Sequence, residues 1–257
     1  MTNIIIYSSC QGDGIETFLK IGLPSKYFKI SKILSFKKIR DKSEFDYDLL
    51  KNCDIFIYQP VNIKYGKYST DPDASDGIFK YLRNGCTKIS FPFVYNSSLW
   101  SMFEEGDDYE NSKIILKLKN EGKSLEDILK LYDDFELDFE YDIRNKYCIS
   151  CLKQRELTSD VKISGFIEEN LIESKILLTQ NHPTSCVLIT MTNEILNLLG
   201  KNIKISNIYD ENISNLPLKY LHNKYDIEHW KFKYEVKCDG DEWTKSLIKK
   251  VYNKSVN

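Results

Sequence analysis

The feature that most constrains the fold of this chain is a series of short apolar runs, the first of which ends in a cluster of small polar residues. This run, residues 3–7, is β-branched and aromatic, and residues 8–12 (SSCQG) follow it. An amphipathic segment comes next, with Ile15, Phe18 and Leu19 on one face. The succession predicts a strand, a tight turn and a helix. A parallel α/β sheet begins in this way.

Four further apolar runs predict the other strands of the sheet. They span residues 28–36, 54–58, 87–91 and 175–179. Helices are predicted between them at 76–82 and after the last run, where Val187, Leu188, Met191, Ile195, Leu198 and Leu199 share a face and Gly200 follows as a C-terminal cap. Strands that alternate with helices and are almost wholly apolar are typical of a parallel sheet covered on both faces. We therefore predict an α/β fold.

Residues 97–170 interrupt this alternation with helical periodicity and many acidic side chains. No linker rich in Gly, Pro or Ser brackets the stretch. We therefore expect a single α/β domain over residues 1–257, with a helical insertion or cap at about 97–170. The segment from residue 201 onward is rich in aromatic residues, and its pattern assigns it no role.

The composition excludes several classes of protein. The chain has 36 Lys and Arg against 38 Asp and Glu, a formal net charge of −2, which predicts no basic face and no nucleic-acid partner. Seven scattered cysteines, an odd number, fit a reducing compartment. No window approaches the roughly 18 apolar residues of a spanning helix, and the first ten residues lack the charged region of a signal peptide. We expect a cytoplasmic protein without membrane insertion.

Polar residues follow three of the predicted strands in a way that core packing does not require. Cys10-Gln11 follows the first strand, Gln59 the third and Asn181-His182 the last. Ligands of open α/β sheets bind at the carboxyl ends of the strands, where the strand order reverses. These side chains are therefore expected to converge on one edge of the sheet.

Cys10 and His182 form a plausible nucleophile and base at that edge. Cys10 lies where a helix begins, so backbone N–H groups and the helix dipole would favour a thiolate and stabilise an oxyanion. His182 precedes Pro183, a residue favoured at the first helical position, so the imidazole would stand at a helix entrance. The structural alternatives stay open, because a free Cys is usually a small core residue and a lone His often only a cap.

The other cysteines give weaker signals. Cys148 and Cys151 form a single CxxC without the second pair that a tetrahedral zinc site needs, so no metal is expected. Cys53, Cys86, Cys186 and Cys238 lie in or beside apolar runs and are interpreted as packing residues.

Four segments together resemble the WcbI family of polysaccharide-biosynthesis proteins. They are IYSSCQG ending at Gly12, DIFIYQP ending at Pro60, YGKYST at 65–70 and NHPT at 181–184. The resemblance covers about the first 200 residues, in the same order. Its most specific elements are the Cys10-Gln11 pair and the Asn181-His182-Pro183-Thr184 block.

The resemblance implies an SGNH-hydrolase-like (flavodoxin-like) fold with Cys in place of the usual Ser nucleophile, binding of coenzyme A, and acetyl transfer in capsule assembly. Cys10 would be the nucleophile and His182 its base, with Gln11, Gln59 and Asn181 around the acyl carbon. The chain departs from the family at Ser8-Ser9, where Gly-Asn is common. It departs from the SGNH pattern at Thr179, where an Asp normally orients the histidine, so a dyad or another orienting group is implied.

The leading hypothesis is acyl transfer, with acetyl as the expected acyl group, from coenzyme A to a sugar hydroxyl of a surface polysaccharide through acyl-Cys10. Lys64, Lys67 and Arg83 are candidate contacts for the phosphates of coenzyme A. Two alternatives remain: an SGNH-type esterase or deacetylase acting on a glycan, and a non-catalytic module that binds coenzyme A or a glycan.

Overall fold

The computed structural model describes residues 1–105, 108–206 and 220–254, which cluster into two compact units. The sheet unit contains residues 1–94, 151–168 and 182–206, and the helical unit contains the described residues of 95–150, 169–181 and 220–254. The helical unit thus draws on more of the chain than the expected insertion at 97–170. The prediction of one domain stays a prediction.

The sheet unit is built on four parallel strands in the order β2-β1-β3-β4. Their bounds are Thr2–Ser8 for β1, Phe28–Leu34 for β2, Ile55–Tyr58 for β3 and Thr87–Ser90 for β4. Tyr7 of β1 lies opposite Ile33 of β2 and Tyr58 of β3. The chain adds β2 on one side of β1, then returns to the other side of β1 to add β3 and β4. The strand order therefore reverses between β1 and β3, the position at which such sheets bind ligands.

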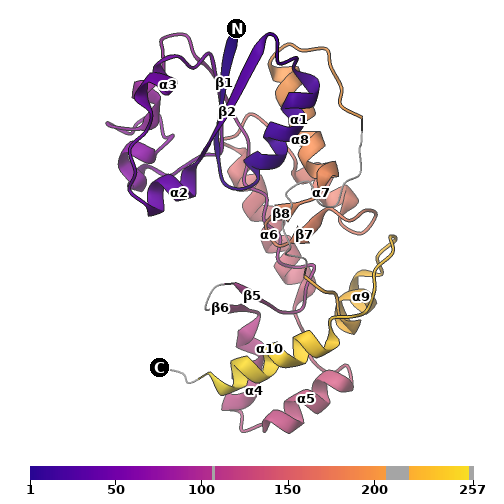
Figure 1. Ribbon diagram of the computed structural model, residues 1–257. Coiled ribbons are helices and arrows are strands. Elements are labelled where there is room, and N and C mark those ends of the chain that lie inside the picture. Colours follow the sequence, from indigo (N-terminus) through magenta and orange to yellow (C-terminus); the bar gives the residue numbers. More distant parts are fainter. Residues whose placement is uncertain (106–107, 207–219, 255–257) are drawn as a thin grey trace. The chain divides into compact units, whose positions relative to one another are not determined.

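Helices cover both faces of this sheet, as the apolar strands predict (Figure 1). Helices α1 (Gly12–Gly22) and α8 (Ser185–Leu198) lie on one face. The other face carries α2 (Ser35–Arg40), α3 (Tyr47–Lys51) and the short 3-10 helices η1 (Ile63–Tyr68) and η2 (Ile78–Tyr81). The core on this second face consists of Ile5, Tyr7, Ile33, Phe45, Leu50, Cys53, Phe56, Tyr68, Ile78 and Cys86.

Helix α1 approaches α8 closely at Gly14, and this contact gives a prediction about stability. A Cβ at Gly14 would overlap the isobutyl group of Leu188, with Cγ at 3.1 Å. Gly14→Ala is therefore expected to lower the free energy of unfolding by about 1–3 kcal/mol, measured by urea denaturation. Gly165→Ala is the control, since that glycine, in α7 (Ser164–Asn170), has nothing within 4 Å of an added Cβ. Equal stability of the two variants would contradict the close approach.

Three predicted elements differ from those observed. The second strand ends at Leu34, where α2 begins, and residues 76–82 form only the short η2. The fifth apolar run forms β7 (Leu177–Thr179), which lies outside the four-stranded sheet. Its Leu178 carbonyl accepts a hydrogen bond from Tyr220 N, 3.1 Å away in the helical unit. A partner so distant in the chain leaves no trace in a local apolar pattern.

The prediction that Gly200 caps the C-terminus of α8 is confirmed, but the prediction that Leu198 belongs to its buried face is wrong. Gly200 has φ +65°, and its N–H and that of Lys201 donate to carbonyls of the last helical turn. Leu198 is 45% exposed, so the buried stripe of the helix ends at Leu196.

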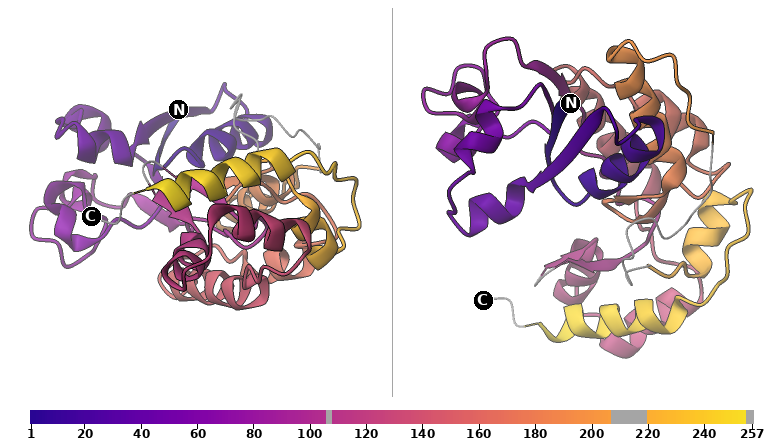
Figure 2. Two further views of the ribbon diagram at one scale, coloured as in Figure 1. Left: turned by 90° about the horizontal axis from the view of Figure 1, so that it is seen from below. Right: turned by 45° about the horizontal axis from the view of Figure 1, so that its top comes forward.

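The helical unit contains a short hairpin and several helices. Strands β5 (Phe103–Glu105) and β6 (Asp108–Glu110) pair in antiparallel fashion, where the sequence predicted helix. The expected helical character is found in α4 (Ser112–Asn120), α5 (Leu125–Asp133) and α6 (Tyr141–Glu156), and α6 and α7 each run from one unit into the other. The last part of the chain forms α9 (Lys224–Trp230) and α10 (Asp241–Asn253), and α10 packs against α4 and α5 (Figure 2). Among the described residues, no helix is both long and apolar enough to cross a bilayer.

Candidate active site

Cys10 lies in the tight turn that joins β1 to α1, at the point where the strand order reverses. Gly12 N donates to Ser9 O at 3.1 Å and Asp13 N donates to Cys10 O at 3.0 Å, so the chain enters the helix within three residues of the strand. A side chain at Gly12 would collide with Ser8, which is why a residue without Cβ stands there. The turn leaves Cys10 half-buried at the carboxyl edge of the sheet.

His182 is brought to Cys10 from the other end of the sheet unit's sequence. Cys10 Sγ and His182 Nε2 are 3.5 Å apart, within hydrogen-bonding reach of a sulfur. His182 belongs to the two-residue strand β8 (His182–Pro183), just before α8. The expectation that Pro183 opens the helix is wrong, because α8 begins at Ser185 with Thr184 as its N-cap. The imidazole is nevertheless placed beside the thiol.

The pKa values of the pair point to a neutral thiol beside a neutral imidazole at neutral pH. Burial raises the pKa of the Cys10 thiol, and the negative charge of Asp13 raises it further. The backbone N–H groups of Cys10 and Gln11 and the Ser9 side chain act in the opposite direction but do not outweigh these effects. Burial also lowers the pKa of His182. The backbone N–H groups thus favour the thiolate as expected, but burial and Asp13 outweigh them, which agrees with a base that removes the proton during attack.

Gln11 and Gln59 brace the Cys10 turn. Gln11 is 3% exposed, and its side chain makes a pair of hydrogen bonds with the backbone of Val94, at 2.7 Å and 3.1 Å. Gln59 Oε1 accepts from Ser9 N at 2.8 Å, and Gln59 Nε2 donates to Gln11 Oε1 at 3.0 Å. The two amides thereby tie the turn to the segments that follow β3 and β4. Their predicted contact with the acyl group stays a prediction.

The other predicted residues lie in different places. Asn181 belongs to the helical unit, where its Oδ1 accepts from the Thr179 hydroxyl at 3.1 Å. Lys64 and Lys67 lie on η1, which follows the carboxyl end of β3. Arg83 pairs with Asp54, the residue before β3, at the amino edge of the sheet. The structure therefore does not bring Arg83 to Cys10.

Two contributors to the site were not predicted from the sequence. Val94 contributes only its backbone N–H and carbonyl to the site, so its residue type gives no indication in the sequence that it takes part. Asp13 lies in the first turn of α1 and forms an ion pair with Lys32, which also approaches Glu16 Oε2 at 3.4 Å. Acidic residues are common in the first turn of a helix, so Asp13 gives no indication in the sequence that it raises the pKa of the neighbouring thiol.

Removal of the Asp13 charge is expected to make Cys10 more reactive. Asp13→Asn lowers the pKa of the thiol and should speed alkylation of Cys10 by iodoacetamide at pH 8 by about two- to fivefold. Glu16→Gln is the matched control. This substitution also removes a partner of Lys32, but the Glu16 carboxylate is not among the groups that raise the pKa of Cys10. The rates follow from mass spectrometry of the Cys10 peptide. A slower reaction in Asp13→Asn would refute the electrostatic role of Asp13.

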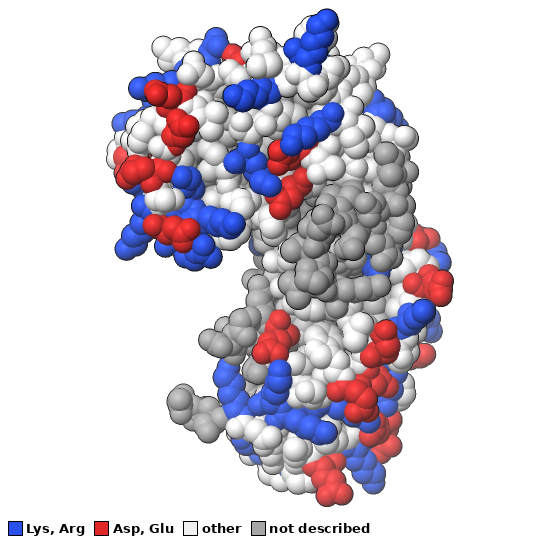
Figure 3. All heavy atoms as spheres, viewed as in Figure 1, with Lys and Arg blue, Asp and Glu red and all other residues white. Residues whose placement is uncertain are grey.

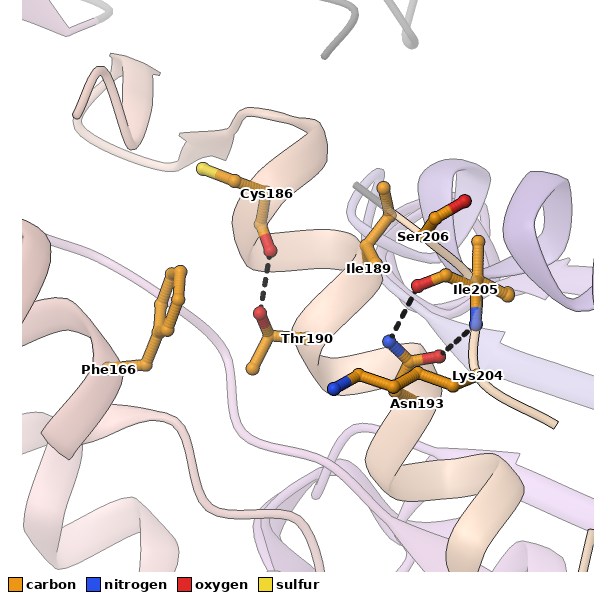
Figure 4. A pocket seen from close by; sticks show the side chains of 8 residues that line it. All are labelled: Phe166, Cys186, Ile189, Thr190, Asn193, Lys204, Ile205 and Ser206. Atoms are coloured by element: carbon orange, nitrogen blue, oxygen red, sulfur yellow. Dashed lines mark hydrogen bonds between the residues drawn. The ribbon is translucent and has the colours of Figure 1, made fainter. Parts of the chain in front are cut away.

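A pocket of about 340 Å³ lies elsewhere in the sheet unit, and Cys10 and His182 are not among its lining residues (Figure 4). Its walls come from Phe166 of α7, from α8 and from residues 204–206. Asn193 makes hydrogen bonds to the backbone N and O of Ile205 and so holds that segment on α8. All seven cysteines are free, and within the described part of the chain no group of three or more His, Cys, Asp or Glu side chains is arranged to hold a metal.

A solved structure of WcbI, described as a novel polysaccharide biosynthesis enzyme, has a TM-score of 0.70 to this chain at 17% sequence identity, over 99% of this chain and 90% of that one. That structure is described as the native protein without a disulfide bond between coenzyme A and one of its cysteines. No curated protein matches the chain significantly.

The structural likeness and the parallel sheet agree with an SGNH-like α/β fold. The family model of WcbI, the polysaccharide biosynthesis enzyme, matches residues 3–203, which include both Cys10 and His182. The matched region covers the whole β1 to α8 succession on which the site is built. The chain therefore belongs to the WcbI family of polysaccharide biosynthesis enzymes.

Proposed function

We propose that this protein transfers an acetyl group from coenzyme A to a sugar hydroxyl of a capsular or other surface polysaccharide precursor, through an acyl-Cys10 intermediate. One observation carries the proposal: Cys10 Sγ lies 3.5 Å from His182 Nε2 at the edge where the strand order reverses. The family's description as a biosynthesis enzyme supports it, as does the mention of coenzyme A with a cysteine in the related structure. The seven free cysteines support a cytoplasmic location.

In the first half-reaction His182 Nε2 takes the thiol proton while Cys10 Sγ attacks the thioester carbonyl carbon. The carbonyl oxygen becomes an oxyanion, and we propose that the backbone N–H groups of Cys10 and Gln11, which favour negative charge on the sulfur, stabilise it. The tetrahedral intermediate then expels the thiolate of coenzyme A, which takes the proton back from His182. Exchange between two thioesters is nearly isoenergetic, which favours Cys over Ser as the nucleophile for this donor.

In the second half-reaction the sugar hydroxyl attacks the carbonyl carbon of acyl-Cys10, with His182 as the base. The C–S bond breaks, the ester forms, and the proton on His182 returns to the sulfur. Lys64 and Lys67 are the proposed contacts for the phosphates of coenzyme A, because η1 follows the carboxyl end of β3 and so belongs to the edge that carries Cys10.

Intact-mass spectrometry after mixing with acetyl-CoA tests the intermediate. The wild type is expected to gain the mass of one acetyl group, and Cys10→Ala to gain none. Cys186→Ala is the control, because the Cys186 thiol is buried and shares a hydrogen bond with the Thr184 hydroxyl. Its replacement should leave the adduct unchanged. An adduct that persists in Cys10→Ala would contradict the proposal.

Two further measurements separate the alternatives. Free acetate released at the full rate without any sugar would assign the protein as an esterase or deacetylase. A rise in melting temperature with coenzyme A, without any adduct from acetyl-CoA, would assign a non-catalytic binding module.

A further inference from the structure

Helix α2 and η1 form an exposed surface, of which the proposed reaction uses only Lys64 and Lys67 of η1. We call it the α2–η1 surface and define it by the exposed residues Phe36, Lys37, Arg40, Lys42, Ile63, Lys64 and Tyr65. All of them belong to the sheet unit. The surface combines apolar and cationic side chains.

Three large apolar side chains stand out of this surface. Phe36 is 42% exposed, Ile63 47% and Tyr65 41%. Single exposed apolar residues are ordinary, but three on two elements in contact offer apolar area that a partner would bury.

Helix α2 is in contact with η1, and the segment that follows α2 is joined to η1 by direct interactions. Lys67 forms an ion pair with Glu44, and Tyr68 Oη donates to Ser43 O at 3.2 Å. Beneath them, the rings of Phe45 and Tyr68 pack edge to face with centroids 5.6 Å apart. The apolar side chains are therefore held by a packed support.

The surface is also basic, although the near-neutral composition predicted no basic face. Residues 35–45 and 63–68 contain six Lys and Arg but only two acidic residues, in a chain with a formal net charge of −2. Both acids are paired within the surface, Asp41 with Arg40 and Glu44 with Lys67. Figure 3 shows Lys and Arg gathered around α2.

The surface adjoins the edge of the sheet that carries Cys10. Helix α2 begins immediately after Leu34, and Leu34 lies opposite Ser8 in the strand register. The η1 segment follows the carboxyl end of β3. A body bound to the α2–η1 surface would therefore lie on the Cys10 side of the sheet.

We propose that the α2–η1 surface docks this protein onto an anionic membrane surface. Lys and Arg attract the negative headgroups, while Phe36, Ile63 and Tyr65 enter the boundary between headgroups and acyl chains. A soluble polyanion would use the cations but would leave the three apolar side chains exposed, which favours a lipid surface. Docking needs neither Cys10 nor His182, so the inference goes beyond the proposed acyl transfer.

Co-sedimentation with vesicles tests the docking. The wild type is expected to bind vesicles of phosphatidylglycerol and phosphatidylcholine, to bind pure phosphatidylcholine at least about tenfold less, and to be released by salt. Lys37→Glu/Arg40→Glu should weaken binding by more than about 25-fold, since each lost cation is worth about fivefold and the two added carboxylates repel the anionic surface as well. Phe36→Ser/Ile63→Ser should also weaken binding, by about tenfold, without any change of charge.

Lys26→Glu/Lys29→Glu is the matched control, because it makes the same change of charge on exposed residues at the amino end of β2. It should bind within about threefold of the wild type. Acetylation of Cys10 by soluble acetyl-CoA should be unchanged in Lys37→Glu/Arg40→Glu, which keeps a failure of docking distinct from a failure of the proposed reaction. Equal loss of binding in the control, or no binding of the wild type to anionic vesicles, would overturn the proposal.

Competition with pyrophosphate tests the alternative ligand. Release of bound protein by millimolar pyrophosphate at constant ionic strength would also overturn the proposal, because it would assign the surface to a soluble polyphosphate.

Discussion

Replacement of His182 by Gln is expected to slow acetylation of Cys10 by about 10²- to 10⁴-fold, the usual contribution of a general base. The expected loss is large because burial raises the Cys10 pKa, so little thiolate exists at pH 7 without a base. Gln has a similar size and can still donate a hydrogen bond, but it cannot take the proton. Quenched-flow sampling of the acyl-enzyme by mass spectrometry gives the rate.

The pH dependence of the same rate distinguishes a base from a merely structural histidine. The pKa of His182 is lowered, so the wild type should keep its rate as the pH falls to 6.5 and lose it only below that. In His182→Gln the rate should instead rise about tenfold per pH unit toward the raised pKa of Cys10, because only the thiolate then reacts. His229→Gln, a change in the helical unit, is the control and should match the wild type. A flat profile in His182→Gln would show that His182 is not the base.

Asp226→Asn is expected to lower the free energy of unfolding of the helical unit by about 3–5 kcal/mol. Asp226 is 1% exposed and joins three separate segments. Its Oδ1 accepts from Ser101 N and Tyr141 Oη, each at 2.6 Å, and its Oδ2 accepts from Asn223 N at 3.0 Å. An amide at this position would place an NH₂ group against one of these donors and leave a buried N–H or O–H without its acceptor.

Urea denaturation measures this loss, and hydrogen exchange of the α9 amides assigns it to the helical unit. Tyr141→Phe should cost less, since it removes only one of the three bonds. The pKa of Tyr141 lies well above its usual value through burial and the charge of Asp226, so the phenol keeps its proton to donate. Asp142→Asn is the control for charge, because Asp142 has a side chain that is 86% exposed and should change stability by less than about 0.5 kcal/mol. A loss as large in Asp142→Asn would contradict the buried network.

Local sequence was sufficient for the part of the fold that positions the nucleophile. Residues 3–22 contain a buried strand, a turn of small residues and an amphipathic helix, and each of these is specified by residues a few positions apart. Cys10 and His182 could be paired in advance because the carboxyl ends of parallel strands and the segments after them meet at one edge. The roles of these two residues remain proposals.

Tertiary structure decided whatever depends on partners distant in the chain. β7 lies outside the main sheet and accepts a hydrogen bond from Tyr220 N, and Gln11 and Gln59 make hydrogen bonds to one another and to the backbone. The protonation state of Cys10 follows from burial and from Asp13, which outweigh the helix-terminus effect that the sequence suggested.

The sequence by itself determined the α/β class and the helices after the first and the last apolar run, and it singled out Cys10 and His182 as the candidate reactive pair, because periodicity and turn chemistry act over a few residues. Only the tertiary structure showed that the pKa of Cys10 is raised and which polar residues brace the site. It also showed that several Lys and Arg side chains lie together on one surface, although the net charge of the whole chain is only −2. Burial, electrostatic fields and surface patches are sums over neighbours in space, and only the fold determines which residues are neighbours.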